Sequence, residues 1–166
     1  FTNLTHRSAA KFAAPDDDGV IEQTALFEIL HQRGTAPEAV YTFKHALIQE
    51  AAYQSLLKSR RQQFHARIAH VIVDQFAGDA EAQPEVVALH HTRAGDLDAA
   101  VNWWQKAGQY AFRRASYAEA IAHYSSGLRV LESLPDERRR AQLELALQVE
   151  SGYALIPLRG WGALET

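Results

Sequence analysis

The feature that most constrains the fold of this chain is a spacing of small and aromatic residues in its C-terminal half. Trp104 is followed by Gly108, and Gly108 is followed twelve residues later by Ala120, with Tyr124 and Gly127 beyond it. On paired helices, small residues let a neighbouring helix approach closely, and aromatic side chains fill the gaps between pairs. The spacing therefore predicts antiparallel helices that stack side by side.

The period of this pattern is about twenty residues. Ala100 and Ala120 occupy equivalent places twenty residues apart, and turn signals stand at 95–96, 114–116 and 134–136. Short turns make successive helices antiparallel neighbours. The offsets resemble those of a tetratricopeptide repeat (TPR). We therefore expect a mostly α fold, an antiparallel helical-hairpin (TPR-like) array, of a class that usually serves as a scaffold for other proteins.

The N-terminal part predicts a different organisation. Apolar residues from 20 to about 30 have helical spacing, although residues 27–31 could be either the end of that helix or a strand. Residues 33–38 supply turn residues, and residues 40–43 favour a strand. A helix followed by a short hairpin resembles the end of a winged-helix domain. We expect three segments: an unassigned segment 1–19, the end of a winged-helix-like region 20–58, and TPR-like repeats 59–166 that are truncated at the C-terminus.

Several element boundaries follow from capping and turn residues. We expect a helix over 45–57 and a second one that Ser59 caps. Residues 76–84 are predicted to form a linker, and Pro84 to begin the next helix, where its missing N–H is harmless. Residues 152–162 predict a helix end followed by a loop. The absence of Met and this abrupt ending indicate a piece cut from a longer protein.

Composition excludes several classes of protein. The chain has 166 residues, of which 47% are hydrophobic, yet no apolar run approaches the ~18 residues of a membrane span. Cys is absent, which removes disulfides and thiolate chemistry. A net charge of −3 provides no global attraction to nucleic acid or anionic lipid. We expect a cytoplasmic protein without a membrane or nucleic-acid partner.

A search for catalytic patterns finds none that is specific. There is neither a Gly-rich phosphate loop nor a nucleophile elbow. No two of the eight histidines are three or four residues apart, so no helix presents the usual pair of metal ligands. We therefore expect no catalytic residue, metal or cofactor in this segment, and no enzyme activity of its own. The histidines are His6, His31, His45, His65, His70, His90, His91 and His123.

Two features are candidates for binding a partner. Arg60 and Arg61 follow Lys58 in a basic cluster, which could bind a phosphate, an acidic partner or DNA, or could be a solvated helix start. Basic residues at a helix N-terminus oppose the helix dipole, which favours a partner. Trp103 adjoins Trp104, and a helix cannot bury both equally. Trp103 therefore faces a groove, a neighbouring domain or solvent.

Residues 33–69 strongly resemble a segment of bacterial multidomain signalling ATPases, and residues 89–135 resemble the repeats of the same proteins. In these proteins a class III adenylate cyclase domain is often followed by an AAA-type NTPase domain, a winged-helix region and TPR-like repeats. The resemblance implies that this chain is the segment after the ATPase core. It implies that other domains of the same polypeptide are its partners, and that the repeats sense a protein or peptide effector.

The resemblance also suggests a nucleotide sensor. In related signalling ATPases a histidine of a Met-His-Asp-like motif reads the nucleotide β-phosphate, and His45 stands at the analogous place here. Lys44 and Ala46 replace the Met and Asp of that motif. The alternative is a histidine that caps or packs at the start of the following helix.

Two further interpretations remain open. The chain could be a free-standing TPR adaptor that binds peptides, or a DNA-binding regulator that uses the winged helix. A hairpin near residues 27–44 favours the signalling segment, whereas continuous helices favour the adaptor. The helix expected at 20–30 carries Glu22 and Glu28 but no Lys or Arg, which argues against DNA. A truncated array exposes an apolar end, which would allow self-association.

Overall fold

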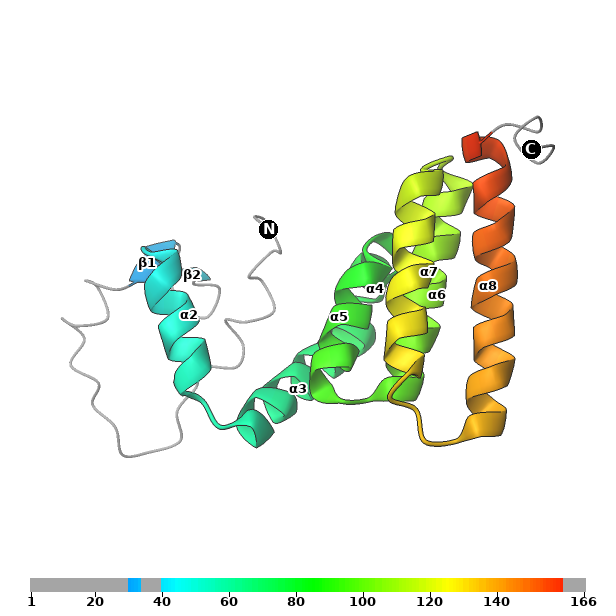
Figure 1. Cartoon of the computed structure of the whole chain (residues 1–166). Coiled ribbons are helices and arrows are strands. Elements are labelled where there is room, and N and C mark those ends of the chain that lie inside the picture. The colour runs from blue at the N-terminus through cyan, green and yellow to red at the C-terminus, as the bar shows by residue number, and fades with distance from the viewer. Residues whose placement is uncertain (1–29, 34–39, 160–166) are drawn as a thin grey trace. The chain divides into compact units, whose positions relative to one another are not determined.

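A computed structural model describes residues 30–33 and 40–159 of the chain (Figure 1). These residues are mostly helical, with one two-stranded sheet, which confirms the predicted mostly α class. The chain divides into two compact units, Phe1–Arg61 and Gln62–Thr166. The predictions for residues 1–19 and for most of the helix at 20–30 lie outside the described residues.

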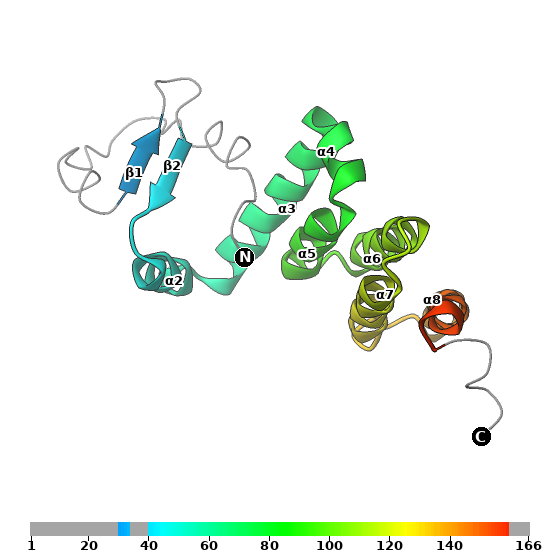
Figure 2. The same cartoon turned by 90° about the horizontal axis from the view of Figure 1, so that it is seen from above.

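The first unit contains the predicted hairpin (Figure 2). Strands β1 (Leu30–Arg33) and β2 (Val40–Phe43) are antiparallel, with Leu30 opposite Phe43. Leu30 therefore begins a strand, which is one of the two alternatives, a helix end or a strand, that the sequence left open for residues 27–31. Helix α2 (Ala46–Ser55) follows, and it begins where the carbonyl of His45 accepts hydrogen bonds from two backbone N–H groups of the first turn.

Three helices form the first part of the helical region: α3 (Lys58–Gln75), α4 (Ala77–Ala82) and α5 (Pro84–Ala94). Helix α3 begins before Ser59, because the carbonyl of Leu57 accepts a hydrogen bond of 3.0 Å from the N–H of Arg61, so Ser59 is not the predicted cap. The linker predicted at 76–84 was also wrong. Its Ala-rich sequence forms α4, and Ala80 is buried against the neighbouring helices.

The remaining helices are α6 (Leu97–Arg113), α7 (Tyr117–Leu131) and α8 (Glu137–Arg159). The turns between them fall where the sequence predicted. Gly95 has a φ of 83°, the left-handed backbone that glycine adopts without strain, and Ala115 has a similar φ of 59° at the equivalent place twenty residues later. Asp136 accepts a hydrogen bond of 3.0 Å from the N–H of Arg139, so it caps α8 within the turn predicted at 134–136.

Helix α8 is longer than the sequence predicted. It continues through Gly152 and Pro157, where we expected a helix end and a loop. Pro157 lies in the last turn, so its missing N–H removes a hydrogen bond near the end of the helix and not in the middle. Ala154, which has no exposed surface, holds this part of α8 in the core.

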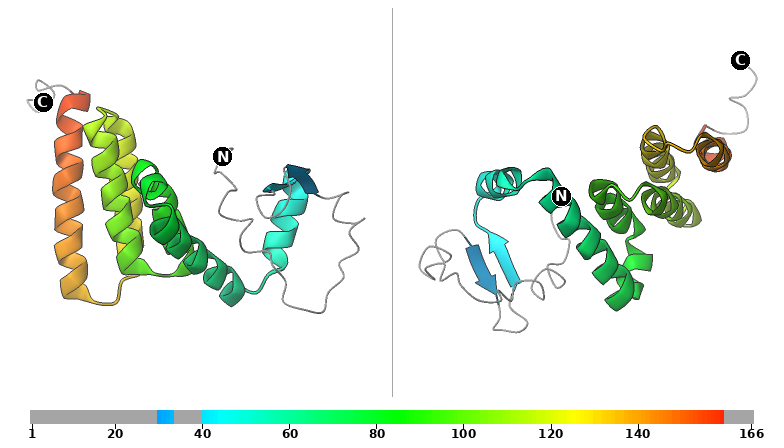
Figure 3. Two further views of the ribbon diagram at one scale, coloured as in Figure 1. Left: turned by 180° about the vertical axis from the view of Figure 1, so that it is seen from behind. Right: turned by 90° about the horizontal axis from the view of Figure 1, so that it is seen from below.

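The helices of the second unit pack as neighbours along the chain. Helix α6 packs between α5 and α7, and α7 packs against α8. The views from behind and from below in Figure 3 show the same order. One core cluster joins α6, α7 and α8 around Tyr124, Leu147 and Val101, and a second joins α3, α4 and α5 around Ile72, Ala80 and Val87.

None of the helices in the described ranges has both the length and the apolar character that crossing a membrane requires.

Candidate binding groove

A groove opens between α6 and the end of α3 with α4. Its volume is about 500 Å³. Helix α6 contributes one wall through Trp103, Lys106, Tyr110 and Arg113, which recur every three or four residues and therefore share one face of the helix. Val73, Ala77, Ala80, Glu81 and Pro84 contribute to the opposite side. Of the three surroundings considered for Trp103, the structure therefore shows a groove.

The groove face of α6 alternates aromatic and basic side chains. The ammonium of Lys106 lies 4.0 Å from the centre of the Trp103 ring. The guanidinium groups of Arg113 and Arg114 lie 6.0 Å and 5.5 Å from the centre of the Tyr110 ring. These are cation–π distances. Such contacts orient a cation while leaving its N–H groups able to bind an anion.

The two cations that line the groove have no acidic partner among the residues that the structure describes. Among the described residues, neither Lys106 nor Arg113 forms an ion pair with a carboxylate. The residues that line the groove include one acidic residue, Glu81, and two basic residues, Lys106 and Arg113. The groove therefore combines a net positive lining with a half-buried Trp103 ring.

A smaller hollow of about 260 Å³ lies next to the same helix. Its lining combines aromatic and polar groups, and Gln109 and Arg113 belong to both hollows. The carboxylate of Glu150 on α8 accepts hydrogen bonds from the amides of Gln105 at 2.6 Å and Gln109 at 3.0 Å. Burial, followed by the Glu150 carboxylate, raises the pKa of the Tyr124 phenol above its ordinary value. Glu150 is thus held by neutral donors across the contact between α6 and α8.

Comparisons with known proteins identify no family for this chain. A protein of Rhizobium meliloti (strain 1021), described as "Uncharacterized protein R02095", is 28% identical over 116 residues. The alignment covers 70% of this chain but 11% of that relative's length. A scan against known protein families finds no match, and no solved structure matches.

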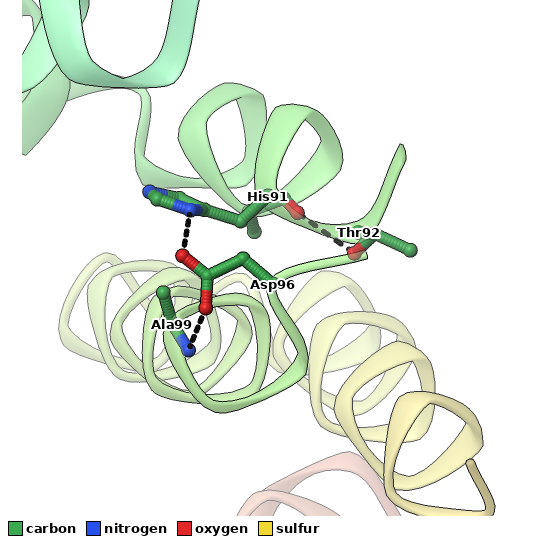
Figure 4. A network of polar contacts seen from close by, with 5 residues as sticks. His91, Thr92, Asp96 and Ala99 are labelled. Atoms are coloured by element: carbon green, nitrogen blue, oxygen red, sulfur yellow. Dashed lines mark hydrogen bonds and ion pairs between the residues drawn. The ribbon is translucent and has the colours of Figure 1, made fainter. Parts of the chain in front are cut away.

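The sequence did not predict that histidines of α3 and α5 would meet. His65 and His90 are twenty-five residues apart, and their Nδ1 atoms lie 2.8 Å from each other in a hydrogen bond. His91, also on α5, lies with its Nδ1 3.1 Å from the Asp96 carboxylate, and the other carboxylate oxygen accepts the N–H of Ala99 at 3.4 Å (Figure 4). Spacing rules for one helix could not reveal pairs formed between two helices.

The histidine contacts stabilise the turn between α5 and α6 and the contact between α3 and α5. Within the described parts of the chain, no group of three or more His, Asp or Glu side chains is arranged to hold a metal ion.

Burial, followed by the charge of Arg93, lowers the pKa of His65 below its ordinary value. Burial is also the main reason that the pKa of His90 falls to about 4, and the neighbours His65, Arg93 and His91 lower it further.

We expect the second unit to lose stability in mild acid. His90 stays neutral in the folded protein down to a pKa of about 4, whereas the unfolded chain binds its proton near 6.5. The free energy of unfolding is therefore unaffected by protonation of His90 above pH 6.5. It decreases as the pH falls from 6.5 toward 4, because over this range the unfolded chain binds a proton at His90 and the folded chain does not. Urea unfolding at pH 7 and pH 5 should differ by about 2 kcal/mol from His90 alone.

A His90→Gln variant is the control for this pH dependence, because Gln keeps a hydrogen-bonding side chain that does not titrate. It should be less stable than the wild type at pH 7, and its stability should change less between pH 7 and pH 5. Equal pH dependence in the two proteins would contradict the assignment to His90.

The other predicted site residues lie in the first unit. Arg61 donates a hydrogen bond of 2.8 Å to the side-chain oxygen of Gln54, and its guanidinium lies 5.2 Å from the centre of the Tyr53 ring. Arg60 is exposed. His45 is exposed at the N-cap of α2 and makes no side-chain capping hydrogen bond, so its backbone, not its ring, begins the helix. A role for His45 in sensing nucleotide stays a prediction.

Proposed function

We propose that this chain is a non-catalytic regulatory and protein-interaction segment of a signal-transduction ATPase of the adenylate cyclase-related type. Its helices form a TPR-like array that binds a protein or peptide effector in the groove beside α6. Binding is transmitted from this array along the chain to the winged-helix-like region, and from there it changes the nucleotide state of the ATPase core. The segment needs no cofactor of its own and works in the cytoplasm.

The observation that carries the proposal is the groove itself. Trp103 is only partly buried, and the basic residues beside it form no ion pair within the described part of the chain. This combination is typical of a surface that binds another protein. Trp103 is one of the two tryptophans of α6, and the other, Trp104, is used within the fold. The Nε1 of Trp104 donates a hydrogen bond of 3.0 Å to Thr92, and its ring stacks on His123.

The contacts of the small residues support a TPR-like array. Gly108 on α6 faces the ring of Tyr124 on α7, and Gly127 on α7 faces Leu147 on α8 as well as Trp104. At each of these glycines, a side chain of an adjacent helix therefore occupies the volume that a Cβ atom would fill. These are the contacts that the spacing of the repeat requires.

The hairpin of β1 and β2 favours the signalling segment over a free-standing adaptor. An adaptor made only of repeats would have continuous helices at 27–44, whereas this region contains two paired strands. A hairpin followed by α2 supports the end of a winged-helix region, as the resemblance to signalling ATPases implies.

A pull-down from a lysate of the source organism tests the proposal. The wild-type chain and a Trp103→Ala variant serve as baits, and mass spectrometry identifies the proteins that they retain. We expect one partner at stoichiometric yield with the wild type and an affinity at least about tenfold weaker for the variant, because half-buried aromatic residues dominate most interfaces. Titration calorimetry with the purified partner gives that ratio.

Phe64→Ala is the matched control. Phe64 is an aromatic residue on α3 that is 49% exposed and is not among the residues that line the groove. Its removal should leave the affinity unchanged. Thermal unfolding of each variant shows whether it is folded. Equal affinity of the folded Trp103→Ala variant and the wild type would exclude the groove as the binding site.

A further inference from the structure

We propose that the partner of the α6 groove is an acidic peptide segment that also carries an apolar side chain. Lys106 and Arg113 bind two of its carboxylates, and Trp103 contacts its apolar side chain. This inference rests on the proposed function, because it names the chemistry of the partner that the same groove binds.

The positions of the two cations define the spacing of the carboxylates. Lys106 and Arg113 are seven residues apart on α6, which places them on the same face and about 10 Å apart along the helix. A partner helix that lies along α6 presents residues seven apart at the same spacing, and an extended chain reaches a similar distance over three residues. Both cations can therefore bind carboxylates of one short segment.

The evidence for acidic ligands is that, among the described residues, Lys106 and Arg113 form no ion pair. Elsewhere in the second unit, basic groups do meet acidic ones: the guanidinium of Arg139 on α8 lies 3.6 Å from the carboxylate of Asp98 on α6. Within the described residues, Lys106 and Arg113 form no such pair, and both line the groove with exposed side chains that a ligand can reach. Arg113 can bind a carboxylate through two parallel N–H groups, and Lys106 provides a point charge.

Trp103 adds the apolar part of the site. Its ring packs against the core cluster of α3, α4 and α5, so its position is fixed, and its remaining surface lines the groove. Lys106 lies over this ring at 4.0 Å, which brings the charge next to the apolar surface. A ligand that fits both must carry a carboxylate close to an apolar or aromatic side chain.

The charge distribution favours a peptide over a nucleic acid. Glu81 is among the residues that line the same groove, and the chain carries a net charge of −3. The backbone of a nucleic acid carries one negative charge per nucleotide, so Glu81 would repel it. The two cations of the groove would add little binding free energy to offset this repulsion. A peptide with two or three carboxylates can place them at the cations and its apolar side chains elsewhere in the groove.

Selection from a random dodecapeptide phage library tests this inference on the whole chain. We expect the enriched peptides to be rich in Asp and Glu next to an aromatic or large aliphatic residue. A synthetic peptide of the enriched sequence should bind the Lys106→Glu/Arg113→Glu variant at least about tenfold more weakly than the wild type, because charge reversal replaces two attractions with two repulsions. Its affinity should also fall as salt is added.

Arg129→Glu is the control for reversing a positive charge outside the groove. Arg129 is an exposed residue of α7 that is not among the residues that line either hollow. This variant should bind the enriched peptide as the wild type does. Circular dichroism of all three proteins establishes that each is folded.

The outcomes separate the inference from the function on which it rests. Enriched peptides without an acidic bias, whose binding needs Trp103 but tolerates the reversal of both cations, would overturn the inference and keep the peptide-binding function. Enriched peptides that bind the Trp103→Ala variant and the charge-reversed variant as tightly as they bind the wild type would overturn both the inference and the peptide-binding function of this groove. The absence of any enriched peptide would do the same. A single-stranded oligonucleotide that binds more tightly than the enriched peptide would replace the acidic peptide with a polyanion.

Discussion

Leu147→Ala should destabilise the second unit by about 3 kcal/mol, one of the two largest effects that we expect. Leu147 lies on α8 with 1% of its surface exposed, in the core cluster that joins α6, α7 and α8. Truncation of a buried leucine removes its transfer free energy and leaves a cavity, which together cost about 2–5 kcal/mol. Urea unfolding followed by circular dichroism measures the change.

The same helix provides the control. Leu145 is two residues away and is 64% exposed, so Leu145→Ala should change the free energy of unfolding by no more than about 0.5 kcal/mol. The two substitutions remove the same atoms from opposite faces of α8. Similar losses for both would mean that α8 does not pack on α7 through the face that contains Leu147.

Much of the helical region could be predicted from local signals in the sequence. Gly95, Asp96 and Asp136 are residues whose backbone or side chain ends or begins a helix by itself, and the structure confirms all three turns or caps. Pro84 begins α5 for the same reason. Such residues act within one turn of chain, so no knowledge of the tertiary structure is needed to interpret them.

The boundaries that were wrong depend on burial, which the sequence does not show directly. Helix α4 forms where Ala80 reaches the cluster of Ile72 and Val87, and α8 continues past Gly152 because Ala154 packs into the core. In both places the local sequence suggests a loop. Contacts with other helices add the stability that local propensity lacks.

The candidate site was predicted only in part. A helix cannot bury two adjacent tryptophans equally, and this identified Trp103 as a candidate. Lys106 and Arg113 were not identified, because single basic residues at helical spacing are common on solvated faces. Their significance depends on α4, which forms the other side of the groove and was expected to be a linker. The contact between His65 and His90 depends in the same way on how two helices pack.

Gly108→Val should cost about 3 kcal/mol and is the second of the two largest effects. A Cβ atom at Gly108 would overlap the ring of Tyr124, which is 2% exposed, so the ring or the two helices would have to shift. Larger residues in a filled core typically cost about 1–3 kcal/mol or more through forced shifts. This cost exceeds the gain of about 0.5–1 kcal/mol that an added side chain brings to a helical glycine.

A graded series of alanine substitutions separates these two effects. At Gly152 a Cβ atom would meet nothing within 4 Å, so Gly152→Ala should stabilise α8 by about 0.5–1 kcal/mol. At Gly127 a Cβ atom would lie 3.0 Å from Leu147 and 3.3 Å from Trp104, so Gly127→Ala should have an intermediate effect on the free energy of unfolding. Gly108→Ala should be the most destabilising of the three substitutions. Chemical denaturation of the three variants gives the order. If Gly108→Ala were as stable as Gly152→Ala, α6 and α7 would have to be farther apart than the spacing of Gly108 and Tyr124 implies, and the proposed TPR-like array would lose its main structural support.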